Sequence, residues 1–309
     1  MKNKIWVLGD AVVDLIPDGD NHYLRCAGGA PANVAVAVAR LGGKSAFIGR
    51  VGKDPLGEFM QRTLMREQVD TRYMKLDPEQ RTSTVVVGLT EEGERSFTFM
   101  VNPSADQFLQ IGDLPAFDAG DWLHCCSIAL INEPSRTAAL TAMQNIAAVG
   151  GKVSFDPNLR ESLWSCREEM IEQVMRAVAL AHVVKFSEEE LCLLTRNHRP
   201  EQAFAEISAR YPEKLIIVTL GKQGAKYHIK GHQALICGKA LKAVDTTGAG
   251  DAFVGGLLAG LAQTAHWQTE EALSAIIRQA NACGALAVTA KGAMSALPTQ
   301  SQLARFLAD

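Results

Sequence analysis

The chain is organised around one stretch near its C-terminal end, Val244-Asp-Thr-Thr-Gly-Ala-Gly-Asp-Ala-Phe-Val-Gly-Gly-Leu-Leu258. The small residues at 246–250 predict a turn, and the almost uncharged run that starts at Asp251 predicts a helix that continues to about Ala265. Because Gly248, Ala249 and Gly250 have almost no side chain, a ligand can approach the backbone of this turn closely.

A glycine turn at the start of a helix is suited to binding an anion. The first N–H groups of a helix lack intrahelical partners, and the helix dipole adds partial positive charge there. Phosphoryl transfer to an alcohol needs such amides to hold the charge of the moving group, and it needs a base for the hydroxyl proton. Asp251 is placed to be that base. The alternative is a tight turn in which Asp251 only caps the helix.

Composition limits the function classes. The chain has 309 residues, enough for one large α/β domain or two modest ones. Its 47% hydrophobic and 21% charged residues are typical of a soluble globular enzyme. A formal net charge of −3, without a dense basic block, argues against nucleic-acid binding.

Three features favour a cytoplasmic location. The apolar run Ile5–Leu8 is too short for a signal peptide, and the uncharged run Ala252–Ala265 is too short to span a bilayer. The seven cysteines show no metal-type spacing, which indicates buried reduced thiols and no zinc site. We therefore expect a cytoplasmic protein without a membrane segment.

Strand and helix patterns alternate along nearly the whole chain, which predicts an α/β fold with a doubly wound, mostly parallel sheet. One pair of β-type runs interrupts this order. Thr82–Leu89 and Arg95–Val101 are separated by the turn-like residues 90–94, which predicts an antiparallel lid attached to the main sheet. The apolar face of that lid has to be covered, by the main domain or by a second subunit.

Polar residues in the first half of the chain are candidate ligand contacts. Asp14 lies in an apolar strand and needs a partner, either a ligand or a salt-bridged surface cation. Asp10, four residues earlier, falls on the same side of a continuous strand. Gly28 and Gly29 expose backbone N–H groups before an alanine-rich helix, and Asn33 offers a donor and an acceptor in its first turns.

Two further strand ends carry candidate residues. Asp156, Asn158 and Arg160 follow a strand at its carboxyl end, where open α/β sheets bind ligands, although Asp-Pro-Asn could be only a turn. The buried strand Leu215–Gly221 leads into a glycine turn that suits a nucleotide. Ser187 predicts an N-cap with Glu190 at the third helical position, so that the three glutamates at 188–190 either form a solvated helix start or orient a hydrated Mg²⁺.

Two motifs together resemble a known family. Ala27-Gly-Gly-Ala-Pro-Ala-Asn33, with Gly42-Gly43 and Gly52, is similar to the N-terminal signature of the ribokinase-like (PfkB) carbohydrate kinases. Asp245-Thr-Thr-Gly-Ala-Gly-Asp251 is similar to their C-terminal signature, and the resemblance runs from about Ile5 to about Pro298. Within the family the chain is most similar to the bacterial fructokinases.

This resemblance implies ATP-dependent phosphorylation of D-fructose to fructose 6-phosphate, with Asp251 as base and residues 248–250 as anion hole. The implied sugar contacts are Asp14, Gly28, Gly29, Asn33, Phe99, Asn158 and Arg160, of which Arg160 also reaches the phosphoryl group. The implied nucleotide contacts are Lys185, Glu190, Thr219, Gly221, Gly224 and Asn281. The positions matching a monovalent-cation site, usually for K⁺, are Asp245, Thr247, Ala287, Ala290 and Gly292.

The resemblance also bears on organisation and partners. It implies a single kinase domain over residues 1–309, with the lid inserted from about 11–26 and 82–101, and a homodimer formed through the lid. Mg²⁺ is expected to be held mainly by the nucleotide phosphates and water. One departure is that Ser187 stands where the family often has Asn, which affects the detail of Mg²⁺–water positioning.

Alternative functions remain at this point. Sister kinases for aminoimidazole riboside, ribose or 2-keto-3-deoxygluconate share every catalytic feature, and the pocket residue Phe99 is one position that could separate them. A non-catalytic sugar-binding regulator could lose Asp251 or the glycines before it, but all are present. A nicotinamide-dependent oxidoreductase would need a Gly-x-Gly-x-x-Gly spacing that the turn at Gly28 lacks.

Overall fold

The main sheet carries the architecture. The computed structural model describes residues 3–19, 21–89, 95–239 and 241–308. Nine strands pair in the order β13-β12-β11-β10-β9-β8-β1-β4-β5. Their bounds are β1 Lys4–Leu8, β4 Lys44–Gly52, β5 Asp70–Asp77, β8 Trp122–Cys126, β9 Lys152–Asp156, β10 Val183–Ser187, β11 Leu215–Thr219, β12 Gly224–Ile229 and β13 His232–Cys237.

The sheet is parallel from β5 through to β11, so the predicted mostly parallel α/β fold is confirmed. At the other edge β12 and β13 run antiparallel to their neighbours. β13 was not singled out from the sequence, and its residues are all exposed or half-buried at the edge of the sheet. The alternation of strand and helix patterns therefore predicts the central strands of this sheet better than its edge strand.

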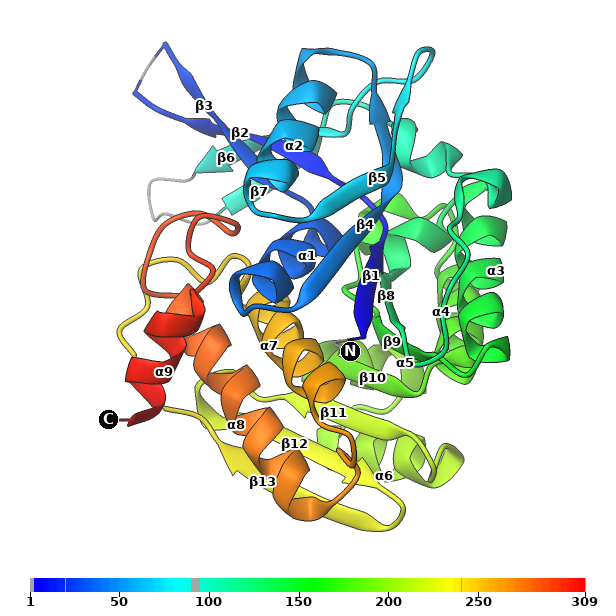
Figure 1. The fold of residues 1–309 in the computed structure, drawn as a ribbon, viewed down its shortest axis with the longest axis vertical. Coiled ribbons are helices and arrows are strands. Elements are labelled where there is room, and N and C mark those ends of the chain that lie inside the picture. Colours follow the sequence, from blue (N-terminus) through cyan, green and yellow to red (C-terminus); the bar gives the residue numbers. More distant parts are fainter. Residues whose placement is uncertain (1–2, 20, 90–94, 240, 309) are drawn as a thin grey trace.

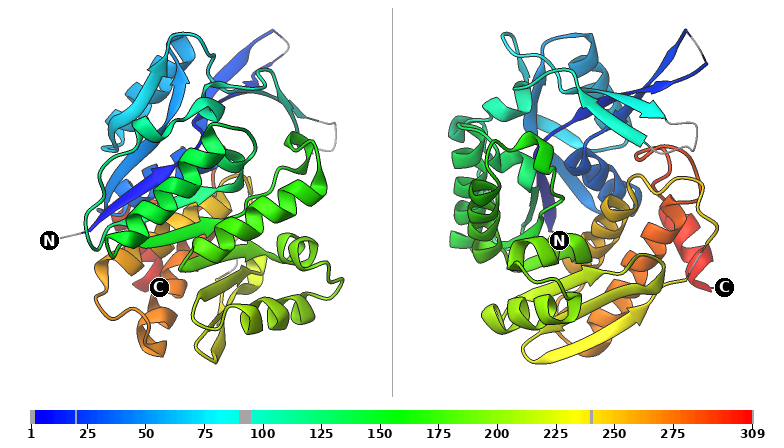
Figure 2. Two further views of the ribbon diagram at one scale, coloured as in Figure 1. Left: turned by 90° about the vertical axis from the view of Figure 1, so that its right-hand side faces the viewer. Right: turned by 180° about the vertical axis from the view of Figure 1, so that it is seen from behind.

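Helices cover both faces of the sheet, as a doubly wound fold requires (Figures 1 and 2). One apolar cluster joins the sheet to α1, α2, α7, α8 and α9, and a second joins the opposite face to α3, α4, α5 and α6. The helices are α1 Ala30–Arg40, α2 Pro55–Arg66, α3 Ser135–Ala148, α4 Arg167–Leu180, α5 Glu188–Thr195, α6 Pro200–Arg210, α7 Ala249–Gln263, α8 Glu270–Ala287 and α9 Gln300–Ala308.

Small residues let α1, α7 and α8 pack closely. A Cβ at Gly255 of α7 would lie 2.3 Å from the Cβ of Ala37 in α1, and one at Gly256 would lie 2.8 Å from the Sγ of Cys283 in α8. Any larger side chain would push these helices apart, because real Cβ atoms do not approach so closely. This packing holds the N-termini of α1 and α7 beside each other at the carboxyl edge of the sheet.

A second, four-stranded sheet stands above that edge, and we call it the lid (Figure 1, upper left). Its order is β3-β2-β6-β7, with β2 Val12–Pro17, β3 Tyr23–Gly28, β6 Thr84–Leu89 and β7 Arg95–Phe99. The predicted antiparallel pair is β6 and β7, and β2 pairs parallel to β6 and antiparallel to β3. The predicted turn at 90–94 lies outside the described residues. That the whole chain is one domain with an inserted lid stays a prediction.

Candidate active site

The first turn of α7 lies at the carboxyl ends of the central strands. Gly248 precedes the helix with φ 79°, a left-handed conformation that glycine adopts without strain. A Cβ at this position would lie 2.9 Å from the Cα of Ala293. The turn can therefore bring its backbone into the site only with glycine at 248.

A cavity of about 270 Å³ lies between this turn, α1 and the lid. Asp251 of α7, Asn33 of α1 and Phe99 of the lid all line it. Predicted sugar contacts also lining this cavity, which we call the sugar cavity, are Asp14, Gly29, Asn158 and Arg160. The structure thus brings together predicted site residues from opposite ends of the chain, such as Asp14 and Asp251.

Asp251 is held by a neighbour from α1. The Nδ2 of Asn33 donates a hydrogen bond to Oδ2 of Asp251 at 2.8 Å. Burial raises the pKa of Asp251 to about 6, and the carboxylate of Asp156 acts in the same direction. The hydrogen bond from Asn33 and the charges of Lys185 and Arg160 lower this pKa. Asp251 is therefore ionised at neutral pH but is more basic than an ordinary aspartate.

A buried ion pair forms part of the cavity wall. Nζ of Lys185 lies 3.0 Å from Oδ2 of Asp156, and the two residues are 8% and 3% exposed. Burial alone would lower the pKa of Lys185, but the carboxylates of Asp156 and Glu190 outweigh it and raise this pKa. Lys185 is therefore a fixed positive charge beside Asp251. Lys185 lines the sugar cavity next to Gly250, and its predicted contact with nucleotide stays a prediction.

A second cavity, of about 320 Å³, lies on the other side of the α7 turn, and we call it the nucleotide cavity. It contains the predicted nucleotide contacts Thr219, Gly221, Gly224 and Asn281. Gly250 lines both cavities. The backbone of the predicted anion hole therefore lies at the boundary between the two cavities.

Comparison with known proteins identifies the family. Residues 2–300 match the model of the pfkB family carbohydrate kinases. A fructokinase of Vibrio alginolyticus is 56% identical over 305 residues, covering 99% of each chain. This chain belongs to the pfkB family. The predicted family and the prediction of a carbohydrate kinase are confirmed, and the oxidoreductase alternative is left without support.

Solved structures agree with this kinase over almost its whole length. A fructokinase double mutant from Vibrio cholerae O395, with fructose, ADP and potassium ion bound, has a TM-score of 0.94 and 57% identity, covering 99% of this chain and 98% of that one. Aminoimidazole riboside kinase from Salmonella enterica, bound to aminoimidazole riboside and an ATP analogue, has a TM-score of 0.92 and 41% identity, covering 99% and 100%. The ribokinase-like fold is therefore confirmed.

Glu190 has a structural position in the kinase. It forms a capping box with Ser187 at the start of α5, as predicted, and its Oε1 accepts a hydrogen bond from the N–H of Leu159 at 2.9 Å. Among the described residues, Glu190 is not part of the lining of either cavity. It holds the segment that carries Asn158 and Arg160, and its contact with nucleotide stays a prediction.

The loop before α7 is closed by Asp245. Its Oδ1 accepts hydrogen bonds from the backbone N and Oγ1 of Thr247 at 3.0 and 2.8 Å, and its Oδ2 accepts one from the N–H of Gly292 at 2.9 Å. The predicted cation residues Ala287 and Ala290 flank Val288, whose carbonyl accepts from the N–H of Asp245 at 3.2 Å. The described residues hold no group of three or more His, Cys, Asp or Glu that could bind a metal. That Asp245, Thr247, Ala287, Ala290 and Gly292 bind a monovalent ion stays a prediction.

Gly29 lines the sugar cavity, whereas Gly28 does not line it but packs against the lining residue Asp14. A Cβ at Gly28 would lie 2.5 Å from Oδ2 of Asp14, and one at Gly29 would lie 2.8 Å from the carbonyl oxygen of Asp10. Gly29 also has φ 93°, which disfavours any other residue. These positions are therefore required for the shape of the site, although direct sugar contact by either glycine stays a prediction.

The predicted placement of Asp10 with Asp14 on a continuous strand is wrong. Asp10 follows β1, precedes β2 and is only 3% exposed. Other cavity residues were not singled out in the sequence. In the nucleotide cavity Phe253, Ala285 and Val288 form an apolar wall, and nothing in their sequence distinguishes them from core residues.

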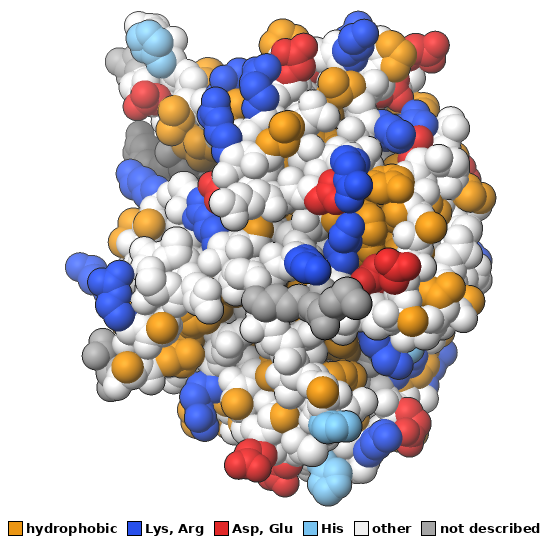
Figure 3. All heavy atoms as spheres, in the orientation of Figure 1, with side chains coloured by type: hydrophobic (Ala, Val, Ile, Leu, Met, Phe, Trp, Pro, Cys, Tyr) orange, Lys and Arg blue, Asp and Glu red, His pale blue; other side chains and the backbone are white. Residues whose placement is uncertain are grey.

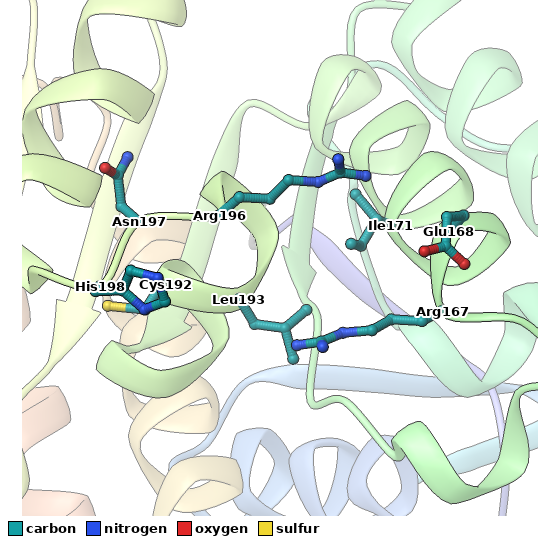
Figure 4. Close-up of a pocket in the computed structure, with 8 residues that line it drawn as sticks. All are labelled: Arg167, Glu168, Ile171, Cys192, Leu193, Arg196, Asn197 and His198. Carbon is teal, nitrogen blue, oxygen red and sulfur yellow. The ribbon is translucent and has the colours of Figure 1, made fainter.

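Another cleft, of about 510 Å³, lies between α4 and the end of α5, and it contains none of the predicted site residues (Figure 4). Arg167 and Arg196 border it on opposite sides. On the face shown in Figure 3, Lys and Arg side chains are interspersed with acidic and apolar ones. Among the described residues, no helix is both long enough and apolar enough to cross a bilayer.

Proposed function

We propose that this kinase transfers the terminal phosphoryl group of ATP to the 6-hydroxyl of D-fructose. The observation that carries the proposal is the position of Asp251, at the first turn of a helix whose Gly250 lines both the sugar and the nucleotide cavity. Similarity to proteins named fructokinase, at 56% identity, supports fructose as the substrate.

Asp251 acts as the general base. Asn33 fixes its Oδ2 at 2.8 Å, and its raised pKa of about 6 makes it a better proton acceptor than an ordinary aspartate while it remains ionised at neutral pH. The hydroxyl proton passes to Asp251 as the oxygen attacks the γ-phosphorus, and the bond from this phosphorus to the β–γ bridging oxygen breaks to release ADP. The N–H groups of the first turn of α7 bind the charge that develops on the phosphoryl oxygens.

Two cations of the chain assist this transfer. Lys185 and Arg160 both line the sugar cavity, and both carry positive charge at neutral pH. Lys185 is fixed by Asp156, whereas Arg160 is exposed and its Nη1 donates to the carbonyl of Leu159 at 2.9 Å. An exposed arginine can reorient, so Arg160 is the residue that follows the phosphoryl group.

Metal ions complete the proposal. Mg²⁺ supplies charge neutralisation on the phosphates when it is bound, held by phosphate oxygens and water. A monovalent cation, most simply K⁺, fits the loop formed by Asp245, Thr247, Ala287, Ala290 and Gly292, as the potassium-containing relative suggests. Its role is to stiffen the loop that leads into the anion hole. Replacing K⁺ by Li⁺ should lower kcat and raise the KM for ATP, and an unchanged rate would exclude this role.

We further propose a homodimer formed through the lid, in the cytoplasm. Tyr23 and Leu24 on β3 are 58% and 55% exposed, which is unusual for large apolar side chains and suits a partner surface. The seven cysteines are all free, which suits a reducing compartment. Leu24→Asp should convert a dimer to a monomer in sedimentation experiments. A wild-type chain that sediments as a monomer would exclude the dimer.

The first experiment measures ADP release with ATP, Mg²⁺ and K⁺ for fructose, ribose, 2-keto-3-deoxygluconate and aminoimidazole riboside. Fructose should exceed the others by a hundredfold or more in kcat/KM, about 2.7 kcal/mol of transition-state discrimination. If aminoimidazole riboside is preferred, the fold and the role of Asp251 stand but the substrate is wrong. If no compound is phosphorylated, the non-catalytic regulator becomes the better explanation.

A further inference from the structure

A small side cavity adjoins the sugar cavity away from the nucleotide. Its volume is about 20 Å³, and Asp10, Phe99 and Ile128 line both it and the sugar cavity. Among the described residues, it shares no lining residue with the nucleotide cavity. A group in the side cavity therefore belongs to the end of the sugar that is remote from phosphoryl transfer.

Two buried oxygen atoms in this side cavity have no hydrogen-bond partner among the described residues. They are Oδ1 of Asp10 and Oε1 of Gln107, whose residues are only 3% and 5% exposed. Leaving such an atom unsatisfied is unfavourable, so a ligand that satisfies it gains affinity. Both atoms are therefore candidates for ligand contact.

The orientation of the Gln107 amide is fixed by its neighbours. Its Nε2 donates to Oδ2 of Asp106 at 2.5 Å, and Oγ of Ser104 donates to Oδ1 of Asp106 at 2.5 Å. Asp106 accepts at both oxygens, so the nitrogen of Gln107 has to face it and the oxygen is the atom that remains. Oε1 of Gln107 is therefore a hydrogen-bond acceptor that a donor group of the ligand can satisfy.

The chemistry of the cavity selects a hydroxyl group. A volume of about 20 Å³ exceeds the roughly 10–15 Å³ that one water-sized group needs, and it is too small for a ring. Burial and the nearby carboxylate of Asp106 raise the pKa of Asp10 to about 7. Asp10 is thus partly protonated at neutral pH, so a hydroxyl can donate to Gln107 and accept from Asp10. An anion would be repelled, and a methyl group would satisfy neither atom.

We propose that the side cavity binds the hydroxymethyl group on the anomeric carbon of a ketose, which makes Asp10 and Gln107 specificity-determining residues. This inference rests on the proposed function and identifies the part of the sugar that is read. In the furanose ring of fructose, the two hydroxymethyl groups lie on the two carbons that flank the ring oxygen. With the 6-hydroxyl at Asp251, the other group extends away from the nucleotide. An aldopentose such as ribose lacks it.

The test compares D-fructose with 1-deoxy-D-fructose, which differs only by the loss of this hydroxyl. In the wild type, kcat/KM should favour fructose by about 10–100-fold, the effect of removing a hydroxyl from a buried polar partner. Asp10→Leu and Gln107→Met, which remove the polar atoms, should each reduce that preference at least fivefold, mainly by slowing fructose. The matched control Asp14→Asn should slow both sugars and keep the preference. Thermal unfolding verifies that each variant is folded.

The outcomes distinguish a failure of the side-cavity inference from a failure of the proposed function. If the wild type phosphorylates fructose but does not distinguish it from 1-deoxyfructose, the side cavity holds only water and this inference is wrong. The same conclusion follows if the preference survives in whichever of the two variants is folded. If the wild type does not phosphorylate fructose at all, the proposed function fails first and this inference with it.

Discussion

The two cavities that meet at Gly250 are built from different materials. The sugar cavity is lined by charged and hydrogen-bonding side chains, among them Asp10, Asp14 and Asp251. The nucleotide cavity is lined mostly by glycines, small residues and apolar side chains such as Phe253 and Val288. With the proposed function, the sugar would be recognised through a few side chains and the nucleotide through the shape of the backbone. Single substitutions should be far more damaging on the sugar side.

The largest effect is expected at the boundary itself. Asp251→Asn keeps the shape of the side chain and removes the base, so kcat should fall by about 10²–10⁴-fold while both substrates still bind. Steady-state kinetics and calorimetric binding of ATP measure this. Near-normal turnover in a folded Asn variant would show that Asp251 is not the base.

The same substitution should stabilise the fold. Because burial raises the pKa of Asp251 from 3.8 to about 6, the folded state binds its proton more tightly than the unfolded chain does. The protonated Asp251 makes its full contribution to the free energy of unfolding below about pH 4, and this contribution is lost as the pH rises through about 6. At pH 7 Asp251→Asn should therefore raise the free energy of unfolding, by up to about 3 kcal/mol. Equal stability of the two proteins at pH 7 and pH 4 would contradict this.

On the sugar side alone, Asp14→Ala should raise the KM for fructose by about 10–100-fold and leave the KM for ATP within about twofold, because the lost hydrogen bonds go to a charged group. Initial-rate measurements with each substrate varied in turn separate the two constants. Equal increases in both would mean that Asp14 supports the lid and does not contact sugar.

The pH profile tests the coupling between α1 and α7. Since Asp251 has to be ionised to accept a proton, kcat/KM should fall about tenfold per pH unit below about pH 6. The hydrogen bond from Asn33 lowers the pKa of Asp251, so Asn33→Ala should move this acid limb to higher pH. A limb that keeps its position while kcat falls would assign Asn33 to sugar binding only.

The smallest effect is expected on the nucleotide side. The Nδ2 of Asn281 donates to the carbonyl of Ile236 at 2.9 Å and so positions the edge strand β13 beside the cavity. Asn281→Ala should raise the KM for ATP only about fivefold, the value of one hydrogen bond, and leave the KM for fructose unchanged. A loss as large as that of Asp14→Ala for fructose would remove the contrast between the two cavities.

The same contrast explains what the sequence could predict. Residues 248–251 could be predicted as a site because the glycine turn and the acid are adjacent in the sequence. The structure places these residues where the two cavities meet. Asn33 lies 218 positions from Asp251, and no local pattern connects them. The wall formed by Phe253 and Val288 looks like core in the sequence, since apolar residues that touch a ligand obey the same periodicity as those that touch a sheet.

The lid is formed by two separate segments, which we call the lid segments, β2–β3 and β6–β7. At each of them the chain leaves the layered core and returns to it. Asp14 and Phe99 lie on these lid segments, whereas Asp251 and its turn belong to α7. Mutations in the lid can therefore change the preferred sugar without disturbing the helix that performs the transfer. This division favours the evolution of new specificities, because mutations in the two lid segments can change the substrate while selection keeps the reaction centre on α7 unchanged.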